Sequence, residues 1–89
     1  DAAEMGLVNR VVPRDDLDDF VADWAARLAA GAPLALSMTK TMLNNSFAVS
    51  MEQAVEDEAR SQAVNFATAD TAEAIAAFLG KREPRFTGH

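Results

Sequence analysis

The sequence predicts a mainly α-helical chain, with a short extended segment at the N-terminus and about four helices after it. Apolar residues recur at helical spacing beyond position 14, and residues typical of helix ends separate these blocks. Only residues 7–12 have the composition of a strand. With 89 residues, of which 49% are hydrophobic, the chain suits at most one small domain. A domain of this size buries about 60–68% of its unfolded surface, so we expect a modest core.

The N-terminal segment is expected to depend on structure outside these residues. Residues 2–6 resemble the last turn of a helix, with Gly6 at the C-terminal cap. Residues 7–12, Leu-Val-Asn-Arg-Val-Val before Pro13, predict a short strand or extended segment. Because no second strand is evident to pair with it, we expect the chain to be a fragment of a larger protein.

The first two helices differ in their apolar faces. Asp15 or Asp16 is expected to cap the first helix and Gly31 to end it, and Pro33 suits the first position of the second. The first helix has one apolar stripe, formed by Leu17, Phe20, Val21, Trp24 and Leu28. In the second, apolar residues spread over more than one face: Leu34, Leu36, Met38, Met42, Leu43 and Phe47. The second helix should therefore need cover on several sides.

The last two helices each follow a capping-box pattern. Residues 50–53, Ser-Met-Glu-Gln, predict the start of the third helix, and residues 70–73, Asp-Thr-Ala-Glu, the start of the fourth. Gly80 and Pro84 are expected to end the fourth helix. No repeat or low-complexity segment is present.

Composition argues against several classes of function. The net charge of −6 disfavours nucleic-acid binding, and the absence of cysteine excludes disulfides and thiolate chemistry and fits a cytoplasmic setting. Neither a signal peptide nor a membrane-spanning segment is recognised. Consecutive carboxylates at residues 56–58 point about 100° apart on a helix, so a solvated face is favoured over acid–base catalysis. His89 is the last residue, and we assign it no metal or base chemistry. No catalytic or metal-binding residue is predicted.

Charge changes sign at the end of the chain. Residues 1–80 carry 5 basic and 13 acidic side chains, whereas residues 81–89 carry 3 basic and 1 acidic. Phe78 and Lys81 lie roughly 60° apart around the fourth helix, where a lysine suits a phosphate and an aromatic ring can flank a base. Equally, Phe78 could belong to the core and Lys81 could be a solvated helix end. Arg82 and Arg85 could support the same phosphate, although pairing with neighbouring acids is preferred.

The order of these segments resembles the C-terminal part of the crotonase superfamily, the enoyl-CoA hydratases and isomerases. The resemblance covers the full chain and rests on the set of motifs rather than on any single one. These are residues 6–13 (GLVNRVVP), 28–40 (notably GAPLA and Thr39-Lys40), 58–59 (EA), 70–73 (DTAE), and Ala76, Phe78, Lys81, Arg82, Pro84, Phe86 and Gly88. One departure is Ala74, where the family often has glycine.

The resemblance implies a division of the chain and a role for its end. Residues 1–13 would be the tail of the family's N-terminal spiral core, which carries the catalytic glutamates and oxyanion hole and is otherwise missing. Residues 14–89 would form the C-terminal helical domain, which packs on the spiral, builds trimer or dimer-of-trimers contacts and closes over CoA. Phe78 and Lys81 would contact the CoA nucleotide, commonly across a subunit boundary.

The implied substrate is an acyl-CoA, with coenzyme A as part of the substrate and no separate cofactor. The whole enzyme would hydrate a 2-enoyl-CoA, with isomerisation, decarboxylation or condensation left open because the upstream part decides them. The alternative hypothesis is a non-catalytic, small, acidic helical interaction module whose apolar second helix docks on a partner.

Overall fold

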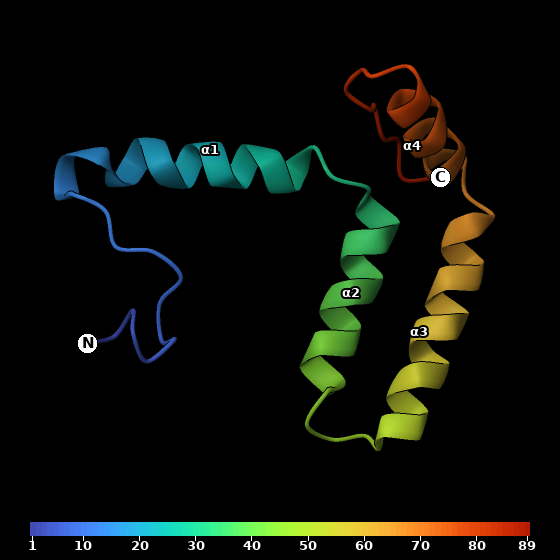
Figure 1. Cartoon of the computed structure of the whole chain (residues 1–89), viewed down its shortest axis with the longest axis horizontal. Coiled ribbons are helices and arrows are strands. Elements are labelled where there is room, and N and C mark those ends of the chain that lie inside the picture. Colours follow the sequence, from blue (N-terminus) through green and yellow to red (C-terminus); the bar gives the residue numbers. More distant parts are fainter.

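The computed structural model describes residues 1–89 and contains four α-helices after an irregular N-terminal segment (Figure 1). A 3₁₀ turn, η1, precedes the first helix. The elements in chain order are η1 (Arg14–Asp16), α1 (Leu17–Ala29), α2 (Pro33–Asn45), α3 (Met51–Phe66) and α4 (Ala69–Leu79). The predicted fold class is confirmed. None of these helices is long and apolar enough to cross a lipid bilayer.

The N-terminal segment is irregular and contains no paired strand. Residues 2–9 form turns and bends, and residues 10–13 have no regular secondary structure. Gly6 has a φ of +75°, which fits the helix-cap position predicted for it. No strand pairs with residues 7–12, and residues 7–9 are bends, so the predicted strand does not form within these residues.

The start of α1 differs from the prediction. The 3₁₀ turn leads directly into the helix, and Asp16 at the N-cap position has φ −96° and ψ −7°. This conformation is already near-helical, whereas a side-chain cap needs an extended residue, and Asp16 makes no capping hydrogen bond. The predicted aspartate cap is therefore wrong, although the helix itself and its end before Gly31 are as expected.

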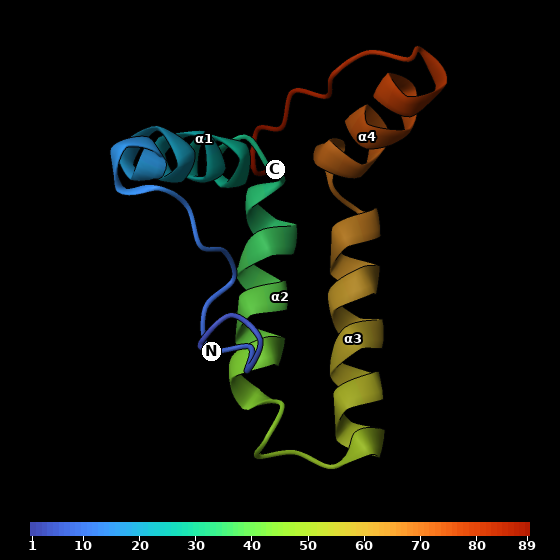
Figure 2. The same cartoon turned by 60° about the vertical axis from the view of Figure 1, so that its left-hand side comes forward.

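Helices α2 and α3 form a hairpin and lie side by side in every view (Figures 1 and 2). Pro33 occupies the first turn of α2, as predicted. At the start of α3, Ser50 Oγ accepts a hydrogen bond from the Gln53 backbone N–H at 3.1 Å. The Gln53 side chain donates to Asp57 instead of returning to Ser50, so only half of the predicted capping box forms.

Helix α4 begins one residue earlier than its predicted cap. Thr68 is the N-cap, and its hydroxyl accepts from the Thr71 backbone N–H at 3.2 Å. The capping box predicted at residues 70–73 is wrong. Thr68 has the extended conformation that a cap needs (φ −86°, ψ 152°), which leaves the side chains of Asp70 and Glu73 free for other contacts.

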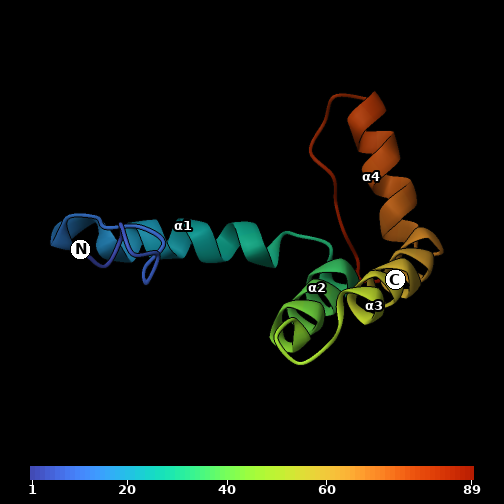
Figure 3. The ribbon, with the colours of Figure 1, turned by 60° about the horizontal axis from the view of Figure 1, so that its bottom comes forward.

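The C-terminal tail, residues 81–89, folds back from the far end of α4 towards the start of α2 (Figures 2 and 3). A Cβ atom added to Gly88 would lie 3.4 Å from Cγ of Pro33. The Asp70 backbone N–H also donates to the carbonyl of His89 at 3.2 Å. The tail thus links α4 to the α2–α3 hairpin.

The molecule is open rather than compact. Its radius of gyration is 16.6 Å, whereas a compact domain of this length has about 12 Å. Its accessible surface is 7527 Å², against roughly 5,000 Å² for a folded monomer of this mass. Only Ala77 and Asp70 are buried, and α1 projects away from the hairpin (Figure 3). The apolar helix faces therefore have little cover within these residues.

Candidate functional site

The start of α4 holds the end of the tail. The Asp70 carboxylate accepts hydrogen bonds from the backbone N–H groups of Thr87 at 2.7 Å and Gly88 at 2.8 Å. The Thr87 hydroxyl donates to it at 3.3 Å. Asp70 is only 4% exposed, and these bonds satisfy its buried oxygens. A carboxylate in the first turn is also favoured by the helix dipole.

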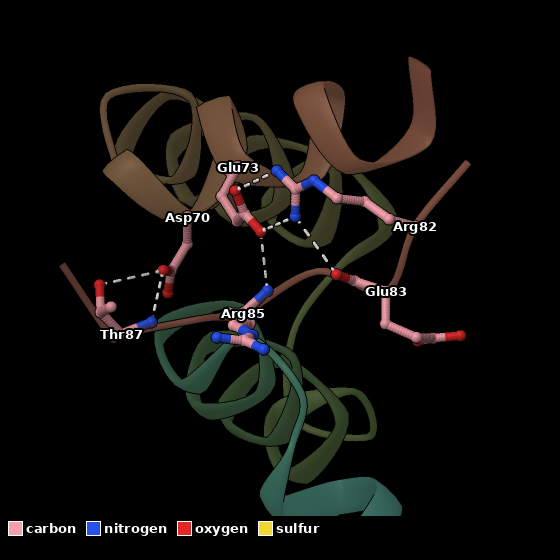
Figure 4. Close-up of polar contacts among 6 residues, drawn as sticks. All are labelled: Asp70, Glu73, Arg82, Glu83, Arg85 and Thr87. Carbon is pink, nitrogen blue, oxygen red and sulfur yellow. Dashed lines mark hydrogen bonds and ion pairs between the residues drawn. The ribbon is translucent and has the colours of Figure 1, made fainter. Parts of the chain in front are cut away.

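One turn later on α4, Glu73 holds the beginning of the tail (Figure 4). Its carboxylate accepts from both terminal nitrogens of Arg82, Nη1 at 2.6 Å and Nη2 at 2.9 Å. The Arg85 backbone N–H donates to the same carboxylate at 2.8 Å. A two-pronged arginine–carboxylate pair fixes orientation as well as distance. Arg82 thus pairs with an acid, which is the alternative preferred from the sequence.

These contacts shift the ionisation of the three groups. The Arg82 side chain, followed by the Arg85 backbone N–H, lowers the pKa of Glu73 from 4.5 to about 2. The Thr87 backbone N–H lowers the pKa of Asp70, with the Gly88 N–H acting in the same direction and burial opposing it. The hydrogen bonds from Arg82 to Glu73 raise the pKa of the guanidinium. Both carboxylates are therefore held in the charged form.

Helix α4 ends in a motif that puts Lys81 in an unusual backbone conformation. The Arg82 N–H donates to the Ala77 carbonyl, and the Lys81 N–H to the Phe78 carbonyl, which is the Schellman pattern. The left-handed position of that motif is occupied by Lys81, with φ +50°, while Gly80 stays helical at φ −80°. The predicted helix end at Gly80 is confirmed, since Gly80 is the C-cap after Leu79, and the residue that reverses the chain is Lys81.

Phe78 and Lys81 are both exposed at this end of α4. The Phe78 side chain is 83% exposed, so it is not part of a core within this chain. Lys81 makes no ion pair. The Arg85 guanidinium is likewise unpaired, since this residue bonds Glu73 only through its backbone. The end of α4 therefore presents an aromatic ring and a cation that internal contacts do not use.

The remaining candidates give no second site. Glu56 pairs with Arg60 on the exposed face of α3, and Asp57 accepts from Gln53. Glu58 lines a shallow hollow between α2 and α3. No group of three or more histidine, cysteine or carboxylate residues is placed to hold a metal ion.

Comparison with known proteins places the chain in a family. The family model described as enoyl-CoA hydratase/isomerase matches residues 1–89, the whole chain. The chain belongs to this family. It is 40% identical over 90 residues to a probable enoyl-CoA hydratase of Mycobacterium tuberculosis, covering 98% of this chain and 35% of that protein. It is 36% identical to the 2,3-dehydroadipyl-CoA hydratase of Escherichia coli, covering 98% of this chain and 34% of the relative.

Solved structures of the family agree with this assignment. The enoyl-CoA hydratase of Bacillus anthracis superposes with a TM-score of 0.92 at 30% identity, covering 99% of this chain and 34% of that one. The enoyl-CoA hydratase/isomerase segment described here therefore spans about a third of the length of the relatives that it matches. The resemblance inferred from the sequence motifs is confirmed.

Sequence reasoning missed the role of Asp70 and Glu73 in holding the tail. It assigned both residues to a cap because their spacing matches a capping box. A signal was nevertheless present, since the acids of α4 are followed within 15 residues by Arg82 and Arg85. Opposite charges on a helix and on the chain leaving it are suited to a fold-back contact.

Proposed function

We propose that this chain is the C-terminal helical segment of an enzyme that acts on acyl-CoA thioesters. In this proposal residues 1–13 join a catalytic core, and residues 14–89 contribute subunit contacts and closure over CoA, with no catalytic residue among them. Phe78 and Lys81 contact the nucleotide part of CoA. The observation that carries the proposal is the exposed, unpaired Lys81 beside an exposed Phe78, on a chain that matches the family over its whole length.

The free surface of the segment supports the proposed packing. Its accessible area exceeds that of a compact protein of this mass by about 2,500 Å², the scale of an obligate interface rather than of a transient one. The apolar face of α1 is part of this surface, with Trp24 42% exposed and its ring edge-on to that of Phe20. We assign these faces to the catalytic core and to neighbouring subunits.

The type of reaction is assigned to the remainder of the protein. Relatives that match this segment include a methylmalonyl-CoA decarboxylase of Escherichia coli at 31% identity and a dienoyl-CoA isomerase of Arabidopsis thaliana at 34%. Together with the hydratases, these names cover three reactions on CoA esters. A segment common to all three is suited to holding the shared CoA group rather than to selecting the chemistry.

The test is the Michaelis constant of Lys81→Ala in the complete polypeptide encoded by the gene. A contact between a lysine and a phosphate contributes roughly 1.5 kcal/mol, so KM for an acyl-CoA substrate should rise about ten-fold while kcat changes less. Arg85→Ala is the matched control, because it removes another unpaired cation from the same tail. Equal effects of the two substitutions, or an unchanged KM in Lys81→Ala, would contradict the proposed contact.

A further inference from the structure

The backbone of Lys81 is held in a left-handed conformation, which a residue with a side chain does not favour. A left-handed backbone conformation is energetically unfavourable for an L-residue that has a Cβ atom, whereas glycine adopts it freely. A non-glycine residue keeps this conformation only where the surrounding structure fixes it. At Lys81 the φ angle is +50°, even though Gly80 is adjacent and could have taken this position. Something beyond the local sequence therefore fixes the turn at Lys81.

The constraint comes from Arg82, the residue that follows. Its backbone N–H is tied to the Ala77 carbonyl at 3.0 Å, and its side chain is tied at two atoms to Glu73. Glu73 also bonds the Arg85 backbone, so the chain is held on the C-terminal side of Lys81 at two points (Figure 4). The Glu73 side chain is only 24% exposed, which limits its freedom to release the tail.

We infer that Glu73 is a positioning residue: through Arg82 it fixes the backbone of Lys81 and so aims this lysine at the anionic part of CoA, which Glu73 itself does not touch. This inference rests on the proposed function, in which Lys81 contacts CoA. Asp70 performs a different task, since it bonds Thr87 and Gly88 at the far end of the tail.

Simple electrostatics predicts the opposite effect of removing Glu73. A carboxylate close to a phosphate site repels the ligand, and its loss also leaves Arg82 unpaired and able to attract an anion. Neutralising Glu73 should then strengthen CoA binding. If Glu73 acts by position, neutralising it weakens binding, because Lys81 and Arg82 become free to move. The sign of the change therefore separates the two explanations.

The experiment measures CoA binding by calorimetry in the complete polypeptide, for Glu73→Gln, Lys81→Ala and the double variant. We expect Glu73→Gln to weaken binding about three- to ten-fold, and the double variant to match Lys81→Ala within two-fold, because a residue that acts through Lys81 has no effect once Lys81 is gone. Arg82→Lys keeps the charge but loses the two-pronged fork, and should give an intermediate loss.

Asp70→Asn is the matched control, since it neutralises a second carboxylate on the same helix that also holds the tail. Its CoA affinity should stay within two-fold of the original. Unchanged or tighter binding in Glu73→Gln, or losses that multiply in the double variant, would overturn the inference. If Asp70→Asn weakened CoA binding as much as Glu73→Gln, a general loosening of the tail would explain both losses, and the specific role inferred for Glu73 would be wrong.

A second measurement separates this inference from the proposed function. If Lys81→Ala leaves CoA affinity unchanged, the CoA contact itself fails. The positioning of Lys81 is then read from amide hydrogen exchange at Arg82, whose N–H is bonded to Ala77. Glu73→Gln should speed this exchange at least ten-fold, whereas an unchanged rate would show that Glu73 does not hold the turn. If Arg82→Lys is the only variant that folds well, the same amide exchange at residue 82 is measured in that variant.

Discussion

At the scale of single residues, the segment uses its acids to bind its own backbone. Asp70 and Glu73 together accept three backbone N–H groups from the tail, at Arg85, Thr87 and Gly88. Residues 85–88 lie outside any helix, and their N–H groups need partners other than a helical ladder. The two carboxylates supply them.

The ionisation of Glu73 gives a direct check of this arrangement. The pKa of Glu73 in the folded protein is about 2, below its ordinary 4.5. A lowered pKa means that the stabilisation is fully present above pH 4.5 and is lost as the pH falls towards 2. Titration of the Glu73 carboxyl carbon by NMR should give a midpoint well below 4.5, and the Arg82→Ala variant should move it upward. A midpoint near 4.5 in the original protein would show that the Arg82 pair does not persist in solution.

At the scale of elements, α4 is positioned by the tail more than by an apolar face. Phe78, Leu79 and Ile75 are all exposed, so the usual packing stripe of a helix contributes little here. The tail instead crosses from the end of α4 to Pro33 at the start of α2 (Figure 2). The orientation of α4 should therefore respond to changes in the tail.

Gly88→Ala tests this dependence. Gly88 has a φ of +82°, so alanine is strained in its backbone there, and its added Cβ would contact Pro33 of α2 at 3.4 Å. A left-handed alanine costs about 1 kcal/mol. In the complete polypeptide, amide exchange at Thr87 should become roughly five-fold faster. Gly6→Ala is the control, because Gly6 has a similar φ of +75° with nothing within 4 Å of its added Cβ. If both variants left Thr87 unchanged, the tail would not depend on its contact at Pro33.

The helices could be predicted from sequence because their signals are local. Pro33 and the periodic apolar residues located α2, and Ser50 located the start of α3. The errors occur where a local signal competes with a distant partner. Residues 70–73 match a capping box, yet the tail recruits both acids. Helix α4 ends at Gly80 as predicted, but the left-handed turn after it falls on Lys81, under a constraint from Glu73, which lies eight residues earlier.

Two candidate residues could be proposed from sequence, but the contacts that surround them could not. The switch in charge at residue 81 and the family motifs pointed to Phe78 and Lys81, and the structure places both at the exposed end of α4. Which cations are free was predicted only in part, because the sequence favoured pairing with acids for both Arg82 and Arg85, whereas the Arg85 side chain is unpaired. Hydrogen bonding distinguishes them, since only the Arg82 side chain is paired with Glu73.

At the scale of the whole molecule, the segment lacks the burial that independent stability requires. Folding must offset about 1–2 kcal/mol of backbone entropy per residue, and burial of apolar surface is the main compensation. With only Ala77 and Asp70 buried and a radius of gyration of 16.6 Å, this compensation is largely missing within the 89 residues. The short helices, of 11 to 16 residues, are marginal in water without tertiary packing.

We therefore expect the isolated 89-residue chain to melt without a cooperative transition, or to associate through its exposed apolar faces. Circular dichroism during heating, together with sedimentation to establish the mass, checks this expectation. In the complete polypeptide the same residues should unfold in a sharp transition, because their apolar faces are then covered. The isolated chain should also fail to hydrate a 2-enoyl-CoA, since the proposal places no catalytic group in it. A monomeric isolated chain with a sharp transition would instead favour a self-sufficient helical module, and turnover by it would place chemistry in the helices themselves.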